Sequence, residues 1–246
     1  MSRFIVPLGF GLAMIVSVAI WWNLPLLGPF GEQIKLGGYL VAGLILLAIL
    51  QTAFIIERTW SLKKAAGRGS LPEFLNNVRK ALHRGDVNAA VQMCGQQRGS
   101  AANVIRAGLE RYQQVLADGA PKEKIVAETQ AAIQEANGLE VPMLERNLIA
   151  LSTIASIATM VGLLGTVIGM INAFAALAHA GAVDATKLAG GISEALINTA
   201  GGLFVAIAGI VAYNVFVTKV DNFNYMMDEA SYEAVQLLSA AATERK

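Results

Sequence analysis

Glu194 is the residue whose type and position point most directly to chemistry, because it is the one charged residue inside the last long apolar stretch, 188–217. An ionisable side chain inside an apolar span is costly, and it persists mainly where it faces a cavity, a partner or an ion path. Asn198 follows four residues later and would share a helix face with it. The alternative is a helix that begins late, with Glu194 among lipid headgroups and Ser193 as its cap. We take Glu194 and Asn198 as candidate ion-path residues.

Two threonines bring hydroxyl groups into the same part of the sequence. Thr199 follows Asn198 directly, and Thr166 lies in the preceding apolar stretch. Their hydroxyls could line a narrow hydrated passage, although an intramembrane threonine can equally bond a carbonyl of its own preceding turn. The residues alone leave both interpretations open.

Small residues recur near these polar side chains at helical spacing. Gly165 and Gly169 form a GxxxG pair, which permits two helices to approach closely. Such stripes are most often plain helix interfaces, so by themselves they indicate assembly and not transport. We expect dense helix packing at Gly162, Gly165, Gly169, Gly202 and Gly209.

The composition places the chain in the membrane class. Of its 246 residues, 55% are hydrophobic and 15% are charged, whereas about 25% are charged in typical soluble domains. A net charge of +1 argues against nucleic acid as a partner. No phosphate-binding glycine loop, zinc-protease motif or serine-hydrolase motif occurs. We therefore expect no enzyme activity, no cofactor and no metal site, and we expect the single cysteine, Cys94, to be buried.

Four apolar stretches are long enough to cross a bilayer, for which a helix needs about 20 residues. They lie at 4–22, 36–56, 147–183 and 188–217. We divide the chain accordingly into an N-terminal apolar segment with a short periplasmic turn (1–34), a transmembrane helix (35–57), a cytoplasmic helical domain (58–147), a transmembrane helix (148–180), a short periplasmic loop (181–187), a further transmembrane helix (188–218) and a cytoplasmic C-terminal helix (219–246).

The orientation follows from basic residues near the ends of the spans, which stay preferentially on the cytoplasmic side. Four of them follow the second span and Lys219 follows the fourth, whereas the opposite segments offer only Lys35 and Lys187. The large loop and the C-terminus should therefore be cytoplasmic. The four basic residues are Arg58, Lys63, Lys64 and Arg68.

The first apolar stretch has two interpretations. Arg3, an apolar run and then Ser17-Val18-Ala19 also resemble a secretory signal with a small-x-small cleavage site. We expect a retained helix, with Trp21 and Trp22 at the outer membrane interface, where indole rings prefer to lie.

The large loop is expected to form a helical bundle. Ser70-Leu71-Pro72-Glu73 is a capping box that predicts a helix to about Arg84, and Gly85-Asp86 ends this helix and opens another. Further helices fit 100–118 and the stretch from Pro121 onward. The loop mixes 13 basic with 10 acidic residues, which indicates a solvated surface and not a binding patch.

Two long stretches resemble signature helices of the TolQ/ExbB proteins, a branch of the MotA/TolQ/ExbB family. The stretch 162–174 (GLLGTVIGMINAF) resembles the second transmembrane signature, and 191–214, which begins GISEALINTA, resembles the third. Weaker matches lie at 57–60 (ERTW) and 144–148 (LERNL). The resemblance covers about residues 35–235 and leaves the N-terminal helix outside it.

The resemblance implies an all-α membrane protein with three family spans, assembled as a homopentamer in the bacterial inner membrane. The extra N-terminal span is expected from the apolar stretch at 4–22 alone. The two signature helices would line a central channel around the single transmembrane helices of two copies of an ExbD/TolR-like partner, which brings an essential aspartate. Thr166 and Thr199 match the channel threonines that face this aspartate, and Glu194 matches the glutamate of the third signature helix.

The chain departs from the family pattern at three positions. Many relatives carry tryptophan where Ile168 stands, alanine where Asn198 stands and proline where Ala208 stands. The absence of that proline predicts a straighter last span. An asparagine beside Glu194 is expected to alter local hydration.

The function that the resemblance implies is a subunit of a proton-driven motor acting on the cell envelope, such as one serving uptake through a TonB-like protein. The segments 172–174 and 213–216 lean towards ExbB. A TolQ-like role in envelope maintenance and a role in motility are alternatives, and coupling to sodium stays open. Two rivals come from other classes: a self-sufficient ion channel in which Glu194 binds the ion, and a membrane assembly scaffold.

Overall fold

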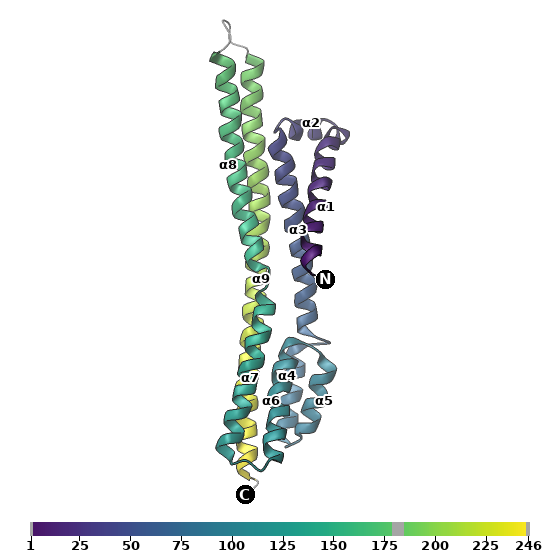
Figure 1. Ribbon diagram of the computed structural model, residues 1–246, viewed down its shortest axis with the longest axis vertical. Helices are drawn as coiled ribbons and strands as arrows, with labels where there is room; N and C mark the ends of the chain where they lie inside the picture. Colours follow the sequence, from purple (N-terminus) through teal and green to yellow (C-terminus); the bar gives the residue numbers. More distant parts are fainter. Residues whose placement is uncertain (1, 179–184, 245–246) are drawn as a thin grey trace. The chain divides into compact units, whose positions relative to one another are not determined.

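Helices make up every regular element that the structure, a computed structural model, describes over residues 2–178 and 185–244. No strand occurs in these two ranges, which confirms the predicted all-α class. The predicted loop 181–187 lies largely outside them. The elements in chain order are α1 (Ser2–Asn23), the 3-10 helix η1 (Leu24–Leu27), α2 (Pro29–Lys35), α3 (Tyr39–Ala66), α4 (Leu71–His83), α5 (Val87–Gln97), α6 (Ser100–Ala117), α7 (Lys122–Glu145), α8 (Leu148–Ala178) and α9 (Ala185–Glu244) (Figure 1).

The chain divides into two compact units. One comprises Met1–Glu57 and Asn147–Val215 and is called the membrane unit below; the other comprises Arg58–Arg146 and Phe216–Lys246 and is called the polar unit. Three parts of the described chain contain a helical segment long and apolar enough to cross a bilayer: Tyr39–His83, Lys122–Leu177 and Ala185–Ala240. The three family spans are thereby confirmed as membrane-length helices. In the N-terminal segment the apolar helical stretch is Gly11–Leu27, which covers the end of α1 and η1 and is shorter than a membrane span, so the extra span stays a prediction.

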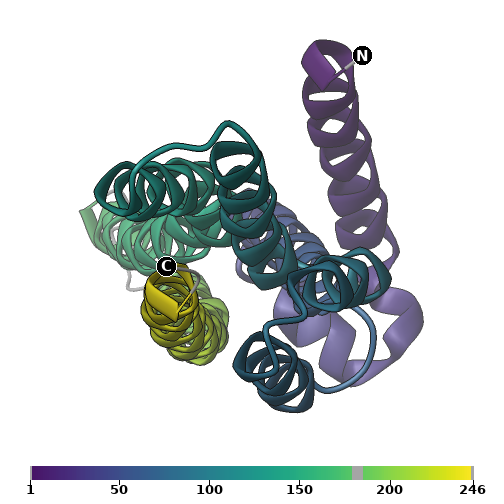
Figure 2. The same cartoon turned by 90° about the horizontal axis from the view of Figure 1, so that it is seen from below.

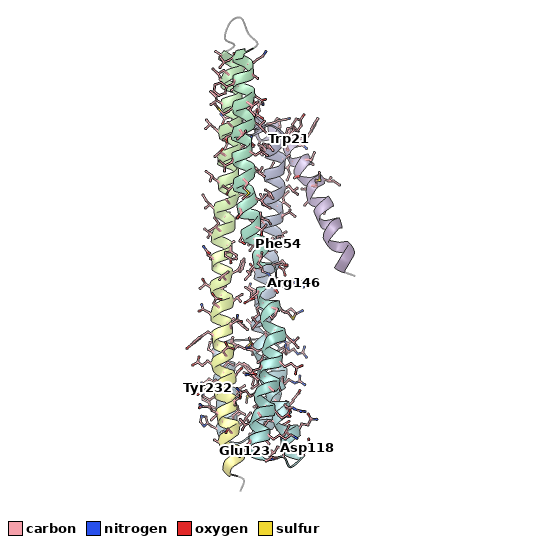
Figure 3. The ribbon with its side chains drawn as sticks, turned by 60° about the vertical axis from the view of Figure 1, so that its left-hand side comes forward. Trp21, Phe54, Asp118, Glu123, Arg146 and Tyr232 are labelled. Carbon is pink, nitrogen blue, oxygen red and sulfur yellow. The ribbon has the colours of Figure 1, made fainter. Side chains whose placement is uncertain are left out.

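The end of α1 packs against the start of α3 in the membrane unit. Trp21, Leu24 and Val41 form a buried cluster, and Trp21 is labelled beside α3 in Figure 3. The Lys35 ammonium lies over the Trp21 and Trp22 rings, 5.4 and 5.6 Å from their centroids. Trp21 is only 9% exposed and Trp22 is 70% exposed. Trp21 therefore packs inside the protein, whereas Trp22 is exposed on its surface.

The polar unit follows the predicted helix signals closely. α4 begins just after Ser70, although the Ser70 side chain makes no capping hydrogen bond. Asp86 does cap α5, since its Oδ1 accepts from the Ala89 N–H at 2.9 Å. Cys94 is buried, as predicted, and burial raises the pKa of its thiol to about 12.

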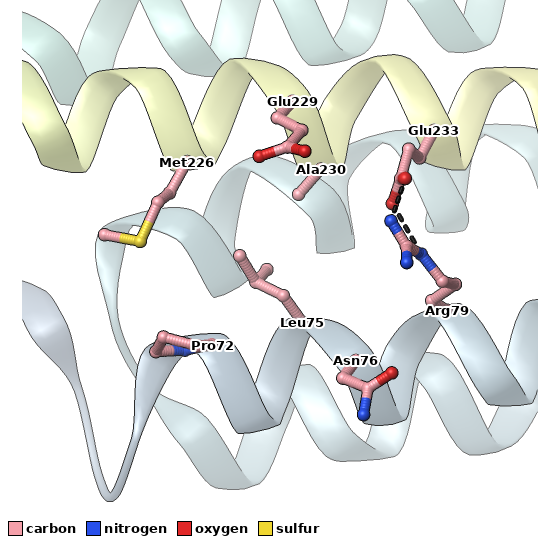
Figure 4. Close-up of a pocket in the computed structure, with 8 residues that line it drawn as sticks. All are labelled: Pro72, Leu75, Asn76, Arg79, Met226, Glu229, Ala230 and Glu233. Carbon is pink, nitrogen blue, oxygen red and sulfur yellow. Dashed lines mark hydrogen bonds and ion pairs between the residues drawn. The ribbon is translucent and has the colours of Figure 1, made fainter.

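Long-range contacts bring α9 against α4 and α7 within the polar unit, which Figure 2 shows end-on. Arg79 of α4 and Glu233 of α9 line a pocket between the two helices and form an ion pair with each other (Figure 4). Asn137 of α7 donates to Asp228 at 2.9 Å. α9 itself continues through Ala208 without a break for 60 residues, in keeping with the absence of proline there.

Arg58 is the most deeply buried charged side chain among the described residues, at 1% exposure. Its Nη1 donates to the carbonyl of Leu144 at 3.2 Å. This carbonyl lies in the last turn of α7, where carbonyls lack a partner from their own helix. The weakly matching stretches 57–60 and 144–148 therefore meet through this bond. In the membrane unit, Asn147 Nδ2 donates to Glu57 Oε2 at 3.3 Å.

Replacing Arg58 should destabilise the polar unit. Arg58→Ala removes a buried donor and leaves the Leu144 carbonyl unpaired, which we expect to cost about 3 kcal/mol. The melting temperature of the purified protein in detergent should fall by roughly 5–10 °C. Arg68→Ala is the matched control, because Arg68 is exposed. Equal effects of the two substitutions would show that the buried bond is not what stabilises this unit.

Candidate functional site

Glycines let the backbones of α8 and α9 approach one another directly. A methyl group added at Gly169 would lie 2.6 Å from the Gly191 carbonyl oxygen, and one added at Gly191 would lie 2.7 Å from the Gly169 carbonyl oxygen. Real side-chain carbons do not approach backbone atoms so closely, so any larger residue would push the helices apart. The contact depends on both positions being glycine.

The same contact continues along the hairpin. A methyl group at Gly202 would lie 2.6 Å from the Ala158 carbonyl, one at Gly162 would lie 3.1 Å from the Asn198 carbonyl, and one at Gly165 would collide with the Asn198 side chain. Residues with higher numbers on α8 contact residues with lower numbers on α9, as expected for two antiparallel helices. At Gly209 the neighbours are Gln51 Oε1 of α3, 2.5 Å away, and Ala155. All five glycines that we singled out thus lie at close helix contacts, and Gly191 is a sixth that we missed.

Glu194 is half-buried and has neighbours from α8 and from the turn before α3. Asn172 of α8 donates from Nδ2 to Glu194 Oε2 at 3.2 Å. The other oxygen, Oε1, lies where a methyl group on Gly38 would be only 2.9 Å away. Gly38 has φ +72°, a conformation that favours glycine, and directly precedes α3. The Glu194 carboxylate therefore lies between α8 and the turn before α3, and its neighbours belong to the same chain.

Asn198 is fully buried at 0% exposure. Its Nδ2 donates to the carbonyl of Gly37 at 2.8 Å and to the carbonyl of Glu194, one turn earlier, at 3.0 Å. Its Oδ1 accepts no hydrogen bond from the described residues. Although Asn198 is one turn from Glu194, its side chain packs in the interior between helices of the same chain.

Both threonine hydroxyls bond backbone carbonyls. Thr166 Oγ1 donates to the Leu163 carbonyl at 2.6 Å, and Thr199 Oγ1 lies 3.2 Å from the Ala195 carbonyl and 3.4 Å from the Gly162 carbonyl. The bonds to Leu163 and Ala195 are the own-turn bonding that we considered as the alternative to lining a passage, whereas the longer one to Gly162 crosses from α9 to α8. Both residues are half-exposed, so the lone pairs of their hydroxyl oxygens can still accept a hydrogen bond.

The outer faces of α8 and α9 are apolar and uncovered. On α8, Leu163, Val167 and Ile171 are 57, 55 and 60% exposed; on α9, Phe204 and Ile207 are 76 and 61% exposed. Contiguous apolar faces of this size mark lipid or protein contacts. The hairpin of α8 and α9 therefore carries a small polar cluster at Glu194, and the apolar surfaces around this cluster are expected to contact lipid or another protein.

Several residues of the cluster escaped the sequence analysis. Asn172 stands in a stretch that we quoted, but nothing in its spacing pairs it with Glu194, which is 22 residues away. Gly37 takes part through its backbone carbonyl, which any residue possesses. Gly38 could have been suspected only once the neighbouring carboxylate was known.

The neighbouring residues Gly190 and Gly191 allow a matched test of the α8–α9 contact. Gly191→Ala should lower the melting temperature in detergent, since its methyl group would meet backbone atoms and cost about 1–3 kcal/mol. A methyl group at Gly190 meets nothing within 4 Å, so Gly190→Ala should be neutral or stabilising by up to about 1 kcal/mol through helix propensity. Equal effects at both positions would contradict the close contact.

Comparison with known proteins agrees with these features. The MotA/TolQ/ExbB proton channel family matches residues 96–229. The Tol-Pal system protein TolQ of Haemophilus influenzae is 44% identical over 104 residues, which are 42% of this chain and 45% of that protein. The putative biopolymer transport protein ExbB-like 3 of Synechocystis is 31% identical over 182 residues, 73% of this chain and 81% of that protein.

The biopolymer transport protein ExbB of Pseudomonas putida is 40% identical over 89 residues, 36% of this chain and 27% of that protein. The matched stretches thus span less than half of the Haemophilus and P. putida proteins but about four-fifths of the Synechocystis one. The family match covers more than half of the chain and includes α8, Glu194 and the glycine contacts. This chain therefore belongs to the MotA/TolQ/ExbB proton channel family.

Proposed function

We propose that this protein is the stator-type subunit of a proton-driven motor in the bacterial inner membrane, working with an ExbD/TolR-like single-span partner. The observation that carries the proposal is the half-buried carboxylate of Glu194, bonded to Asn172 in the glycine-packed α8–α9 hairpin that the family match includes. A titratable group at such a place is expected in an ion path.

Five copies would place their α8–α9 hairpins around the single spans of two partner copies. The uncovered apolar faces of α8 and α9 support such an assembly, because they need a protein or lipid cover. The large loop and the C-terminus would be cytoplasmic, as the basic residues after the second and fourth stretches indicate.

In the mechanism, a proton entering from the outer face neutralises the partner's aspartate. The neutral side chain can then pass the apolar, small-residue wall of the hairpins, and release of the proton inside drives the next step. Each proton is worth about 2.3 kcal/mol per 100 mV. Thr166 and Thr199 would accept a hydrogen bond from the protonated acid, and Glu194 would provide a second carboxyl group on the path.

The process that the motor drives is the finer part of the proposal. Uptake through a TonB-like protein fits the ExbB-named relatives, and envelope maintenance fits the TolQ-named relatives equally well. The first test is purification of the tagged chain from its native membrane, followed by mass spectrometry. A stoichiometric partner with one transmembrane helix and an aspartate near its start is expected.

Proton flux tests the roles of the three residues. The complex is reconstituted in vesicles, a potassium diffusion potential is imposed, and proton entry is followed with a pH-sensitive dye. Glu194→Gln, Thr166→Val and Thr199→Val should each slow the flux by about tenfold or more, which corresponds to ~1.4 kcal/mol on the barrier. Thr153→Val is the matched control, because Thr153 is exposed on α8 and bonds its own turn at Ile149.

Two results would overturn the proposal in different ways. Equal flux through vesicles that contain this chain alone would favour the self-sufficient channel. Wild-type flux in all three variants, with the partner bound, would favour the assembly scaffold.

A further inference from the structure

The bond from Asn198 to Gly37 joins two elements that the helix ladder itself does not connect. Asn198 lies on α9, and Gly37 lies in the turn between α2 and α3. The donor–acceptor distance is 2.8 Å, and the asparagine is fully buried. A buried amide inside an apolar unit is costly unless its protons are bonded, and the Gly37 carbonyl needs a donor for the same reason. The Asn198 N–H and the Gly37 carbonyl therefore satisfy each other.

The space around this bond admits little else. A methyl group at Gly165 would collide with the Asn198 side chain, and one at Gly37 would lie 2.9 Å from the Ile197 side chain. Two helices and one turn thus meet at this amide group: α8 through Gly165, α9 through Asn198 and the turn before α3 through Gly37. We call the Asn198–Gly37 hydrogen bond and its close surroundings the brace. It fixes the position of the turn against α9 and also contributes stability.

The carboxylate of Glu194 depends on the same turn. Its Oε1 occupies the room left by Gly38, the residue after Gly37, and its Oε2 accepts from Asn172. If the turn moved away from α9, one of the two walls around the carboxylate would move with it. The Asn198–Gly37 bond opposes that movement.

We infer that Asn198 is a positioning residue: its amide fastens α9 to the turn that precedes α3 and thereby holds Glu194 between Gly38 and Asn172. The inference rests on the proposed function only for its consequence, since the position of Glu194 matters to transport if Glu194 lies on the ion path. The brace itself can be measured without any transport assay.

A disulfide between α3 and α9 reports on the brace. A methyl group at Gly201 would lie 3.1 Å from Leu44 Cδ1, so cysteines at these two positions would face each other across the α3–α9 contact, and the rate at which Leu44→Cys and Gly201→Cys cross-link in the full-length complex measures how closely the two helices approach. Cys94 adds little background, because burial raises the pKa of its thiol to about 12. Asn198→Leu keeps the number and branching of the side-chain heavy atoms but removes the amide, and Asn198→Ala removes both. Each should slow cross-linking about threefold, the effect expected for one intramembrane hydrogen bond.

Labelling of Glu194 by dicyclohexylcarbodiimide, quantified by mass spectrometry of its peptide, reports on the carboxylate. Asn198→Leu and Asn198→Ala should both raise the labelling rate several-fold in protein that elutes as intact complex. Asn172→Ala is the matched control: it should also raise the labelling of Glu194, because it removes the Oε2 donor, but it should leave the cross-linking rate between positions 44 and 201 unchanged.

The outcomes separate this inference from the proposed function. Unchanged cross-linking in both Asn198 variants would overturn the brace, and so would slowing by Asn198→Ala but not by Asn198→Leu, since packing alone would then explain it. Asn198→Leu keeps the test possible if Asn198→Ala fails to assemble. If cross-linking and labelling change as expected while Glu194→Gln still conducts protons normally, the brace stands and the proposed role of Glu194 fails.

Discussion

The structure of the membrane unit depends on the direct approach of two backbones at Gly169 and Gly191, where carbonyl oxygens occupy the room that side chains would take elsewhere. Lipid tails are as apolar as leucine, so no hydrophobic force draws helices together in a bilayer, and van der Waals packing must supply the attraction. Close packing of α8 on α9 also sets which side chains face each other. The Asn172–Glu194 bond exists only because the glycines bring these two helices within its reach.

Much of the fold could be predicted because its signals are local. Uncharged apolar stretches showed three membrane-length helices, and turn residues such as Gly85 and Asp86 showed where the polar helices end and begin. Even there, the capping-box pattern predicted where α4 begins better than it predicted the capping hydrogen bond. α4 begins after Ser70 as the capping box indicates, yet the Ser70 side chain makes no capping bond. The proline that follows and the packing of the helix are enough to start it.

The polar cluster could not be predicted in the same way, because its contacts join residues far apart in the chain. Asn198 bonds a backbone carbonyl 161 residues earlier, and a carbonyl leaves no mark on the sequence. The same limit applies to Arg58, whose acceptor on Leu144 is 86 residues away. Helical spacing placed Asn198 one turn from Glu194, but it could not show that the turn before α3 would pack against the asparagine. A face of a single helix says nothing about which neighbour covers it.

The exposed apolar bend that joins α1 to α3 has a consequence for depth. Trp22, Leu26, Phe30 and Tyr39 are 70, 83, 69 and 84% exposed, and side chains of these types settle at the boundary between acyl chains and headgroups. In the assembly proposed above, the bend would therefore limit how deeply the start of α3 enters the bilayer. Because the Gly37 turn belongs to the same segment and is bonded to Asn198, residues that precede the family match at 96–229 would then also influence the depth of the Glu194 carboxylate in the membrane.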